Sequence, residues 1–406
     1  LWKSADGEDD ALGPIRRFLS GAPHAFRPNE EVASAFDGVQ PPPLPAQRRA
    51  VGLALGLKDV LLIQGPPGTG KTYTLALVVK ALAQQGQRVA IATYTHRAAD
   101  EVMNKLASAA PELEIRKLGR PEAVAAQHSD KCLDDMLARK NDIPRCSKEQ
   151  MLVDLEARRA DLASLLSAPA VYIGTTHAWL SGAYDALPRM MSDGQQTLFD
   201  VVVVDEASQI ITPNLVGVLR LAKRWILVGD HKQLPPIVVG DTAGILAATL
   251  FEAIAEHPER DTSLIVQLDT QHRMPTTLSD FIGNTFYGGH LKTSATAAKR
   301  SPLAACAHPL MTTSHCISLV NVAQSTETIH LKQFIDEANW ITGTMAELAK
   351  HGWPLRDKAD KPTIGIIAPY RAQVALLRRC LERRFEGEVE HEFWNDVVDT
   401  VDRFQG

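Results

Sequence analysis

The sequence lacks a long hydrophobic run, a signal-peptide pattern and an excess of positive charge. No stretch reaches the roughly 18 uninterrupted apolar residues that a membrane helix needs, and the N-terminus lacks the basic and then apolar segments of a signal peptide. We therefore expect a protein of the cytoplasm, nucleus or nucleoid rather than a membrane or secreted protein. The formal net charge of -5 and the pI of about 6.2 mean that any contact with nucleic acid must be local.

Cysteine is also scarce. Five cysteines are widely scattered, with no C-x-x-C pair and no histidine at zinc-finger spacing: Cys132, Cys146, Cys306, Cys316 and Cys380. We expect reduced thiols that pack as small hydrophobic side chains.

The composition that remains is that of a folded protein with more than one core. Hydrophobic residues make up 45% and charged residues 22%, which are ordinary globular values. A chain of 406 residues exceeds what one core usually supports, so we expect two domains. Residues 1–44, which end in the proline-rich "VQPPPLP", are expected to form a linker or the remnant of a preceding domain. Because the chain starts at Leu1 and stops inside a motif, we expect a fragment.

Short apolar segments alternate with helical patterns from residue 45 onward. Five of them are typical of buried strands: 59–65, 88–95, 170–176, 199–208 and 224–230. Strands that are continuously apolar, such as "VVVV" at 201–204, are covered by helices on both faces. The pattern predicts an α/β fold with parallel sheets. We assign 45–263 to a first domain and 264–406 to a second, whose clearest strands are 363–370 and 396–406.

A charged stretch interrupts the first domain at about 120–168. Leu133, Leu162 and Leu166 are among its apolar residues at helical spacing, which predicts an inserted helical hairpin. A solvated structural arm and an element that grips a nucleic-acid strand are both compatible with this pattern.

The segment "LIQGPPGTGKTYTL", residues 62–75, contains the pattern G-x-x-x-x-G-K-[ST] between an expected strand and an expected helix. Its glycines let backbone N–H groups face phosphate oxygens at a helix N-terminus, where the dipole favours negative charge. Lys71 would reach the β and γ phosphates, and the Thr72 hydroxyl would bind Mg²⁺. The expected nucleotide-binding residues are Gly65, Pro66, Pro67, Gly68, Thr69, Gly70, Lys71, Thr72 and Tyr73.

Two acids follow the most apolar segment. Asp205 and Glu206 stand at its carboxyl end, where ligands of open parallel sheets bind. Asp205 can hold the Mg²⁺ shell, and Glu206 is placed to take a proton from the attacking water. A kinase would not need the second carboxylate, so the pair indicates ATP hydrolysis.

Three further residues extend this site. Gln233, in "VGDHKQLPP", can sense the γ phosphate through its amide, and Gln47, in "PAQRRAV", can bind the adenine edge. For Gln47 a capping or surface role is the alternative. Arg273, in "LDTQHRMP", belongs to the expected second domain and can stabilise the transferring phosphate, with an inter-domain salt bridge as the alternative.

Nine segments stand in an order that is similar to that of one family. The chain resembles superfamily 1 helicases of the nonsense-mediated-decay branch, which includes senataxin-type helicases and the eukaryotic replication helicase-nuclease. The resemblance runs from about residue 44 to Gly406. It is carried by "PAQRRAV", "GPPGTGKT", "ATYTHRAADEV", "GTTHAWL", "VVDEASQ", "VGDHKQLPP", "QLDTQHRMP", "IGIIAPYRAQ" and "VDTVDRFQG".

The resemblance implies two RecA-like domains that hydrolyse ATP with Mg²⁺ between them and move 5′ to 3′ along single-stranded DNA or RNA. Arg273 would be the first arginine finger, and His272 takes the place of the aromatic that stacks on the base in the decay helicase. The chain ends before the last motif with its second arginine finger, so we expect a poor motor. The implied strand contacts, for which a loop-structuring role is the alternative, are Thr95, His96, Thr175, Thr176, Pro369, Tyr370 and Thr400.

The sequence therefore predicts an ATP-dependent helicase or translocase. An ATP-gated nucleic-acid clamp without processive unwinding is the alternative, as is the motor part of a helicase-nuclease fusion. Glu206 favours the motor, because a binding switch does not require a hydrolytic base.

Overall fold

In the computed structural model of this protein, the residues described are 36, 38–119, 124, 126–133, 136, 161–162, 164–166, 168–180, 197–236, 249–257, 262–300, 317–323, 329–330, 332–357 and 359–404. No helix among them is long and apolar enough to cross a membrane. Cys132 is buried, with its thiol 3.5 Å from the Gly119 carbonyl oxygen, and Cys380 is a half-buried thiol. Cys146, Cys306 and Cys316 lie outside the described residues.

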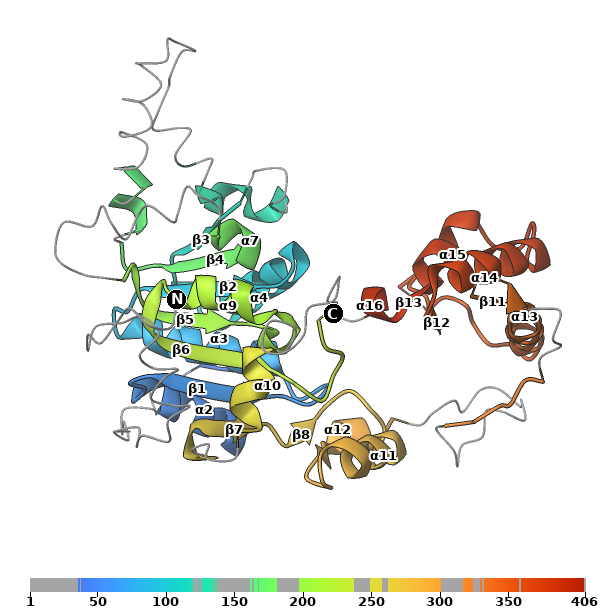
Figure 1. Ribbon diagram of the computed structural model, residues 1–406, viewed down its shortest axis with the longest axis horizontal. Coiled ribbons are helices and arrows are strands. Elements are labelled where there is room, and N and C mark those ends of the chain that lie inside the picture. Colours follow the sequence, from blue (N-terminus) through green and yellow to red (C-terminus); the bar gives the residue numbers. More distant parts are fainter. Residues whose placement is uncertain are drawn as a thin grey trace, which may run out of the picture. The chain divides into compact units, whose positions relative to one another are not determined.

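A seven-stranded sheet, in the order β3-β4-β2-β5-β6-β1-β7, organises the first part of the chain (Figure 1). Every neighbouring pair in it is parallel. The α/β class and the five expected strands are confirmed, whereas β3 and β7 were not expected. The strands are β1 (Val60–Gln64), β2 (Val89–Thr93), β3 (Ile115–Lys117), β4 (Val171–Thr175), β5 (Phe199–Val204), β6 (Ala222–Gly229) and β7 (Ile265–Gln267).

Successive strand residues point to opposite faces of this sheet, and each face has its own core. On β5, Val201 and Val203 pack on one face, whereas Val202 and Val204 pack on the other. The first face is covered by α2 (Pro45–Leu55), α3 (Lys71–Gln84) and α4 (His96–Ala109). The second is covered by α7 (Thr176–Trp179), α9 (Thr212–Leu219) and α10 (Leu250–Ala255). Two buried faces explain why these strands are continuously apolar.

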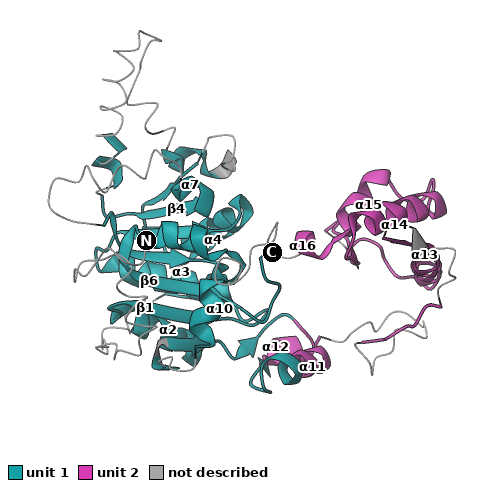
Figure 2. Cartoon of the chain, viewed as in Figure 1, with its two compact units in different colours: residues 1–273, 283–292 teal, residues 274–282, 293–406 magenta. Residues whose placement is uncertain are grey.

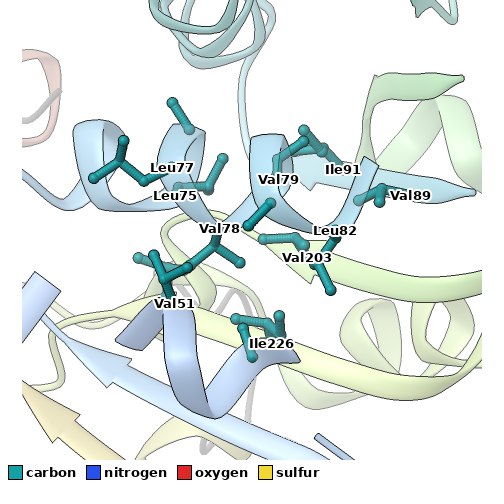
Figure 3. Close-up of a cluster of buried hydrophobic side chains, with 14 of the residues drawn as sticks. Val51, Leu75, Leu77, Val78, Val79, Leu82, Val89, Ile91, Val203 and Ile226 are labelled. Carbon is teal, nitrogen blue, oxygen red and sulfur yellow. The ribbon is translucent and has the colours of Figure 1, made fainter. Parts of the chain in front are cut away.

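Helix α3 lies deepest in the first core. Its residues 74–82 are all buried, and Figure 3 shows Leu75, Leu77, Val78, Val79 and Leu82 among side chains from α2, β2, β5 and β6. Each such side chain contributes about 1.5–3 kcal/mol when it leaves water. The helix that begins at the phosphate loop is therefore anchored in the core along most of its length.

The chain divides into two compact units, residues 1–273 with 283–292 and residues 274–282 with 293–406 (Figure 2). This differs from our expectation that the second domain begins at residue 264. The reason is β7, which pairs with β1 and so extends the first sheet. The division runs through α11 (Thr276–Phe286) and the two-stranded sheet of β8 (Thr270–Gln271) and β9 (Lys292–Thr293).

The second unit has a small core of its own. Its strands β12 (Ile366–Ala368) and β13 (Val398–Thr400) are parallel and pack with α13 (Ile335–Lys350), α14 (Arg371–Arg384) and α15 (His391–Val397). Trp394 is fully buried there between Phe385 and Phe393. Short elements complete the described residues: α12 (Ala295–Ala298), β10 (Ile329–His330), β11 (Gln333–Phe334), α16 (Val401–Phe404), and the 3-10 helices η3 (Ala126–Lys131), η5 (Ala207–Gln209) and η7 (Thr262–Leu264).

Two expected segments fall largely outside the described residues. These are the linker at 1–44 and the inserted hairpin at about 120–168. From the second, the structure describes η3 and places Leu133, Leu162 and Leu166 in the core on the second face of the sheet. The hairpin itself stays a prediction.

Candidate nucleotide and nucleic-acid sites

The loop between β1 and α3 needs its glycines for shape. Gly68 and Gly70 have φ angles of 78° and 79°, in the left-handed region that favours glycine. At Gly65, an added Cβ would lie 2.1 Å from Cγ of Lys71. The Thr69 hydroxyl and N–H both donate to the Pro66 carbonyl, at 2.7 and 3.3 Å, which closes the loop on itself. The result is a backbone turn around a space that side chains would fill at these positions.

Lys71 joins this loop to the acid pair. It is the first residue of α3, and its Nζ donates to the Gly65 carbonyl oxygen at 3.1 Å. The same Nζ lies 3.6 Å from Oε1 of Glu206. The ammonium group is thus held between the loop backbone and the carboxylate that follows β5, where it can exchange the Gly65 carbonyl for a phosphate oxygen.

The two acids differ in environment although they are adjacent. Asp205 is only 4% exposed, and its Oδ1 accepts the Glu206 N–H at 3.0 Å. Burial, and then the negative charge of Glu206, raise the pKa of Asp205 to about 7, against the opposing effect of Lys71. Glu206 is half-buried and has a φ of 50°, a strained conformation for a residue other than glycine. A buried carboxylate that ionises poorly fits a cation site, because a cation would favour its charged form.

Gln233 reaches the same end of the sheet through Asp230. Its Nε2 donates to Oδ2 of Asp230 at 2.7 Å, and the Asp230 side chain is fully buried. The Asp230 N–H donates in turn to the Ser208 hydroxyl at 3.0 Å. Because Ser208 stands three positions after Asp205, the loops after β5 and β6 are bonded to each other. Asp230 and Ser208 stand in the two quoted motifs but were not predicted as functional residues, since nothing in the spacing shows this contact.

Gln47 caps helix α2, which is the role we gave as the alternative to an adenine contact. Its Oε1 accepts the Leu44 N–H at 2.9 Å at the start of α2, and the residue is 4% exposed. Its Nε2 lies 3.4 Å from the position of a Cβ added to Gly70, so the amide nitrogen faces the end of the phosphate loop. The Tyr73 hydroxyl donates to the Pro41 carbonyl, and burial raises the pKa of Tyr73. An adenine contact by Gln47 stays a prediction.

Arg273 ends the first of the two segments that form the first compact unit, whereas the sequence predicted that it belongs to the second domain. The Leu268 N–H donates to the Gln64 carbonyl at 2.8 Å, so the chain runs along β1 to the phosphate loop. There the His272 N–H donates to the Gly68 carbonyl at 2.8 Å, and Cβ of Arg273 lies 2.6 Å from where a Cβ on Gly68 would be. The structure therefore brings His272 and Arg273 to the loop within the first unit.

The implied strand contacts of the first unit lie at the carboxyl ends of β2 and β4. These strands are neighbours, with Thr93 paired to Thr175. The Thr95 hydroxyl caps α4 by accepting the Ala98 N–H at 3.1 Å, and the Thr175 hydroxyl caps α7 in the same way. The loop-structuring alternative thus describes both hydroxyls. His96 is exposed, whereas the Thr176 side chain is buried and has no hydrogen-bond partner among the described residues.

In the second unit the implied contacts also follow paired strands. Pro369 and Tyr370 come directly after β12, and Thr400 ends β13 opposite Ala368. Tyr370 is 39% exposed, and Nζ of Lys332 lies 5.0 Å from its ring centroid. The Thr400 N–H donates to Oδ1 of Asp399 at 2.7 Å. Each unit therefore presents polar residues at the carboxyl ends of parallel strands.

Comparison with known proteins identifies a family for the chain. Two family models, both described as an AAA domain, match residues 44–257 and residues 246–406. Since the first match alone covers more than half of the 406 residues, the chain belongs to the AAA-domain family.

Curated relatives confirm the resemblance to superfamily 1 helicases. The Mus musculus protein named DNA replication ATP-dependent helicase/nuclease DNA2 is 28% identical over 424 residues, or 97% of this chain and 35% of that protein. The Arabidopsis thaliana helicase/nuclease JHS1 is 29% identical over 381 residues, or 89% and 24%. The Rattus norvegicus DNA-binding protein SMUBP-2 is 28% identical over 413 residues, or 89% and 38%. The chain thus spans only 24% to 38% of the length of these relatives.

Solved structures give a weaker likeness. The structure of PRRSV helicase is 17% identical with a TM-score of 0.31, and covers 62% of this chain and 38% of that chain. An Arterivirus nonstructural protein 10 (helicase) in complex with DNA is 16% identical with a TM-score of 0.33, and covers 61% and 43%. At these scores the likeness adds nothing to what the sheet order already establishes.

Proposed function

We propose that this chain is the ATP-hydrolysing motor of a nucleic-acid helicase or translocase that moves 5′ to 3′ along a single strand. The observation that carries the proposal is the contact of Lys71 with both Gly65 and Glu206. It joins a phosphate-binding loop to a carboxylate that can act as a base. The curated relatives, whose names contain the words helicase or DNA-binding, support the same conclusion and favour DNA as the first track to test.

The proposed cofactor is ATP with Mg²⁺. Mg²⁺ supplies charge neutralisation on the phosphates, and Thr72 and Asp205 are the residues that would hold it. In nucleotide sites Mg²⁺ is held by one or two protein groups together with phosphate oxygens and water, which is consistent with a contribution from Thr72 and Asp205 alone. The nuclease named in some relatives is not proposed for this chain.

Each proposed residue has a separate task in hydrolysis. Lys71 would leave the Gly65 carbonyl and neutralise the γ phosphate. Glu206 would accept a proton as water oxygen attacks the γ phosphorus, while ADP departs with the bridging oxygen. Gln233 would orient that water. Arg273, which starts beside Gly68, would stabilise charge on the γ phosphate.

The strand is proposed to bind at the carboxyl ends of β2 and β4 in the first unit and of β12 and β13 in the second. His96 and Tyr370 are exposed there and can meet sugar, phosphate or a base face. Hydrolysis would change how these two sets of contacts hold the strand. An ATP-gated clamp would use the same contacts without net movement.

The test is the rate of ATP hydrolysis by the full natural protein, with and without oligo(dT) and a matched oligo(U). We expect hydrolysis that single strands stimulate, and strong weakening of binding by salt. Stimulated hydrolysis without displacement of a duplex or of a bound roadblock would establish the clamp instead. Hydrolysis that no oligonucleotide changes would refute both.

A further inference from the structure

Tyr287 is a buried tyrosine that the hydrolysis scheme above does not use. It follows α11 directly, in the part of the chain that belongs to the first unit, and is only 6% exposed. Gly288 and Gly289 follow with φ angles of 58° and 76°, and the Gly289 N–H donates to the Gly283 carbonyl at 2.9 Å. This glycine turn ends the helix.

The Tyr287 hydroxyl meets the carboxylate that holds Gln233. It donates to Oδ2 of Asp230 at 2.6 Å, and the same Oδ2 accepts the Gln233 amide at 2.7 Å. Oδ1 of Asp230 accepts the Lys232 N–H at 3.2 Å. A fully buried carboxylate is costly unless donors surround it, and here three donors do so.

The carboxylate decides which way the Gln233 amide faces. An ionised carboxylate can only accept hydrogen bonds, so it selects the NH₂ group of Gln233 and turns Oε1 away from itself. That oxygen is the atom that can accept a hydrogen from an attacking water, as an amide does in other nucleotide hydrolases. If the carboxylate shifted, the amide could rotate or flip, and the water would lose its orientation.

We propose that Tyr287 is a positioning residue for ATP hydrolysis, which holds Asp230 in place so that the Gln233 amide presents its oxygen to the attacking water. The inference rests on the proposed ATPase function. Burial, and then Asp230, raise the pKa of Tyr287, so its hydroxyl stays a donor throughout the pH range of an assay. A second link supports the geometry. Lys292, five residues later, bonds to Asp269 through both its N–H and its Nζ, so the segment is fixed at both ends.

The experiment compares steady-state ATP hydrolysis, with saturating oligo(dT) and Mg²⁺, for wild type and Tyr287→Phe in the full natural protein. The substitution deletes one hydroxyl and keeps the ring. We expect kcat to fall by about fivefold to thirtyfold while KM for ATP changes by less than about twofold, because ground-state binding does not use the water. Tyr172→Phe is the matched control. Tyr172 is also buried, and its hydroxyl donates to the carbonyls of Leu165 and Ala168 instead.

A double-mutant cycle separates positioning from general loss of stability. If Tyr287 acts through Gln233, Tyr287→Phe should cause little further loss of kcat in a Gln233→Ala background. Equal losses in both backgrounds, or an unchanged kcat in the single variant, would overturn the inference while leaving the ATPase intact. A wild type without ATPase would instead refute the proposed function.

If Tyr287→Phe does not fold, Asp230→Asn provides the same test. Its amide can donate as well as accept, so the preference for one face of Gln233 is lost. We expect kcat to fall by a similar factor in Asp230→Asn. We expect little further fall when Asp230→Asn is made in the Gln233→Ala background. Retention of full kcat in a folded Asp230→Asn protein would contradict the inference.

Discussion

The carboxyl edge of the first sheet has two halves that share a backbone design and differ in how their side chains are used. On the half formed by β5, β6 and β1, which we call the phosphate half, charged groups contact one another, as Lys71 contacts Glu206. On the half formed by β3, β4 and β2, which we call the threonine half, the hydroxyls of Thr95 and Thr175 cap helices. A bound ligand would replace contacts on the first half and add contacts on the second.

This difference shows where substitutions should act. Removing a charged group from the phosphate half should affect chemistry more than stability. The strained backbone of Glu206 and the raised pKa of Asp205 are features that proteins keep where a ligand binds. Removing a cap from the threonine half should affect stability first.

Lys71→Ala should reduce ATP turnover by at least about a hundredfold, because a charge that contacts both the loop and Glu206 would be lost. The measurement is phosphate release at saturating oligo(dT). Lys58→Ala, an exposed lysine just before β1, is the control and should keep full activity. Turnover in Lys71→Ala within about threefold of wild type would place the nucleotide elsewhere.

Glu206→Gln should stop hydrolysis and leave ATP binding nearly intact, since the amide keeps the size of the side chain but cannot take a proton. Binding of a fluorescent ATP analogue and phosphate release are measured on the same sample. Glu112→Gln, at an exposed glutamate that follows α4, controls for the loss of one charge. If Glu206→Gln turned over normally, the base would have to be another residue.

Asp205→Asn should raise the melting temperature of the nucleotide-free, Mg²⁺-free protein at pH 8 by about 2–4 °C. Because the folded chain raises the pKa of Asp205 to about 7, it disfavours the ionised form. Wild-type stability is therefore highest while Asp205 is protonated and is lost as pH rises through that pKa. The gain from Asp205→Asn should shrink as the pH is lowered to 5. A variant that melts below wild type at pH 8 would show that the charge is well satisfied.

The sequence was sufficient to predict local features of the fold and site, but not the contacts between residues that are distant in the chain. Continuous apolar runs identified five strands, and glycine spacing identified the phosphate loop, because both are local patterns. Strands β3 and β7 have three residues each, too few to show a period. The contact of Tyr287 with Asp230 joins residues 57 positions apart, and the left-handed backbone of Glu206 is imposed by its surroundings. The place of Arg273 beside Gly68 could not be predicted, because nothing local shows that β7 extends the first sheet.

Thr95→Ala should cost about 1 kcal/mol of unfolding free energy, the usual cost of a lost N-cap. In contrast to the variants above, it should change turnover without nucleic acid by less than about twofold. Urea unfolding and basal phosphate release are the measurements. Thr95→Ser keeps the capping oxygen and should behave as wild type. A stable Thr95→Ala protein with impaired basal turnover would break the division between the two halves.

His96→Ala should have the smallest effect on the protein itself, because the exposed ring follows the cap without contributing to it. Its effect should show only when a strand is present. We expect the oligo(dT) concentration for half-maximal stimulation to rise by about threefold to tenfold, as for the loss of one stacking or backbone contact, with basal turnover unchanged. His391→Ala, on α15 of the second unit, removes another exposed ring and serves as the control. If His96→Ala and His391→Ala gave the same stimulation curve, the carboxyl ends of β2 and β4 would lose their place as the strand site, and the threonine half would be structural alone.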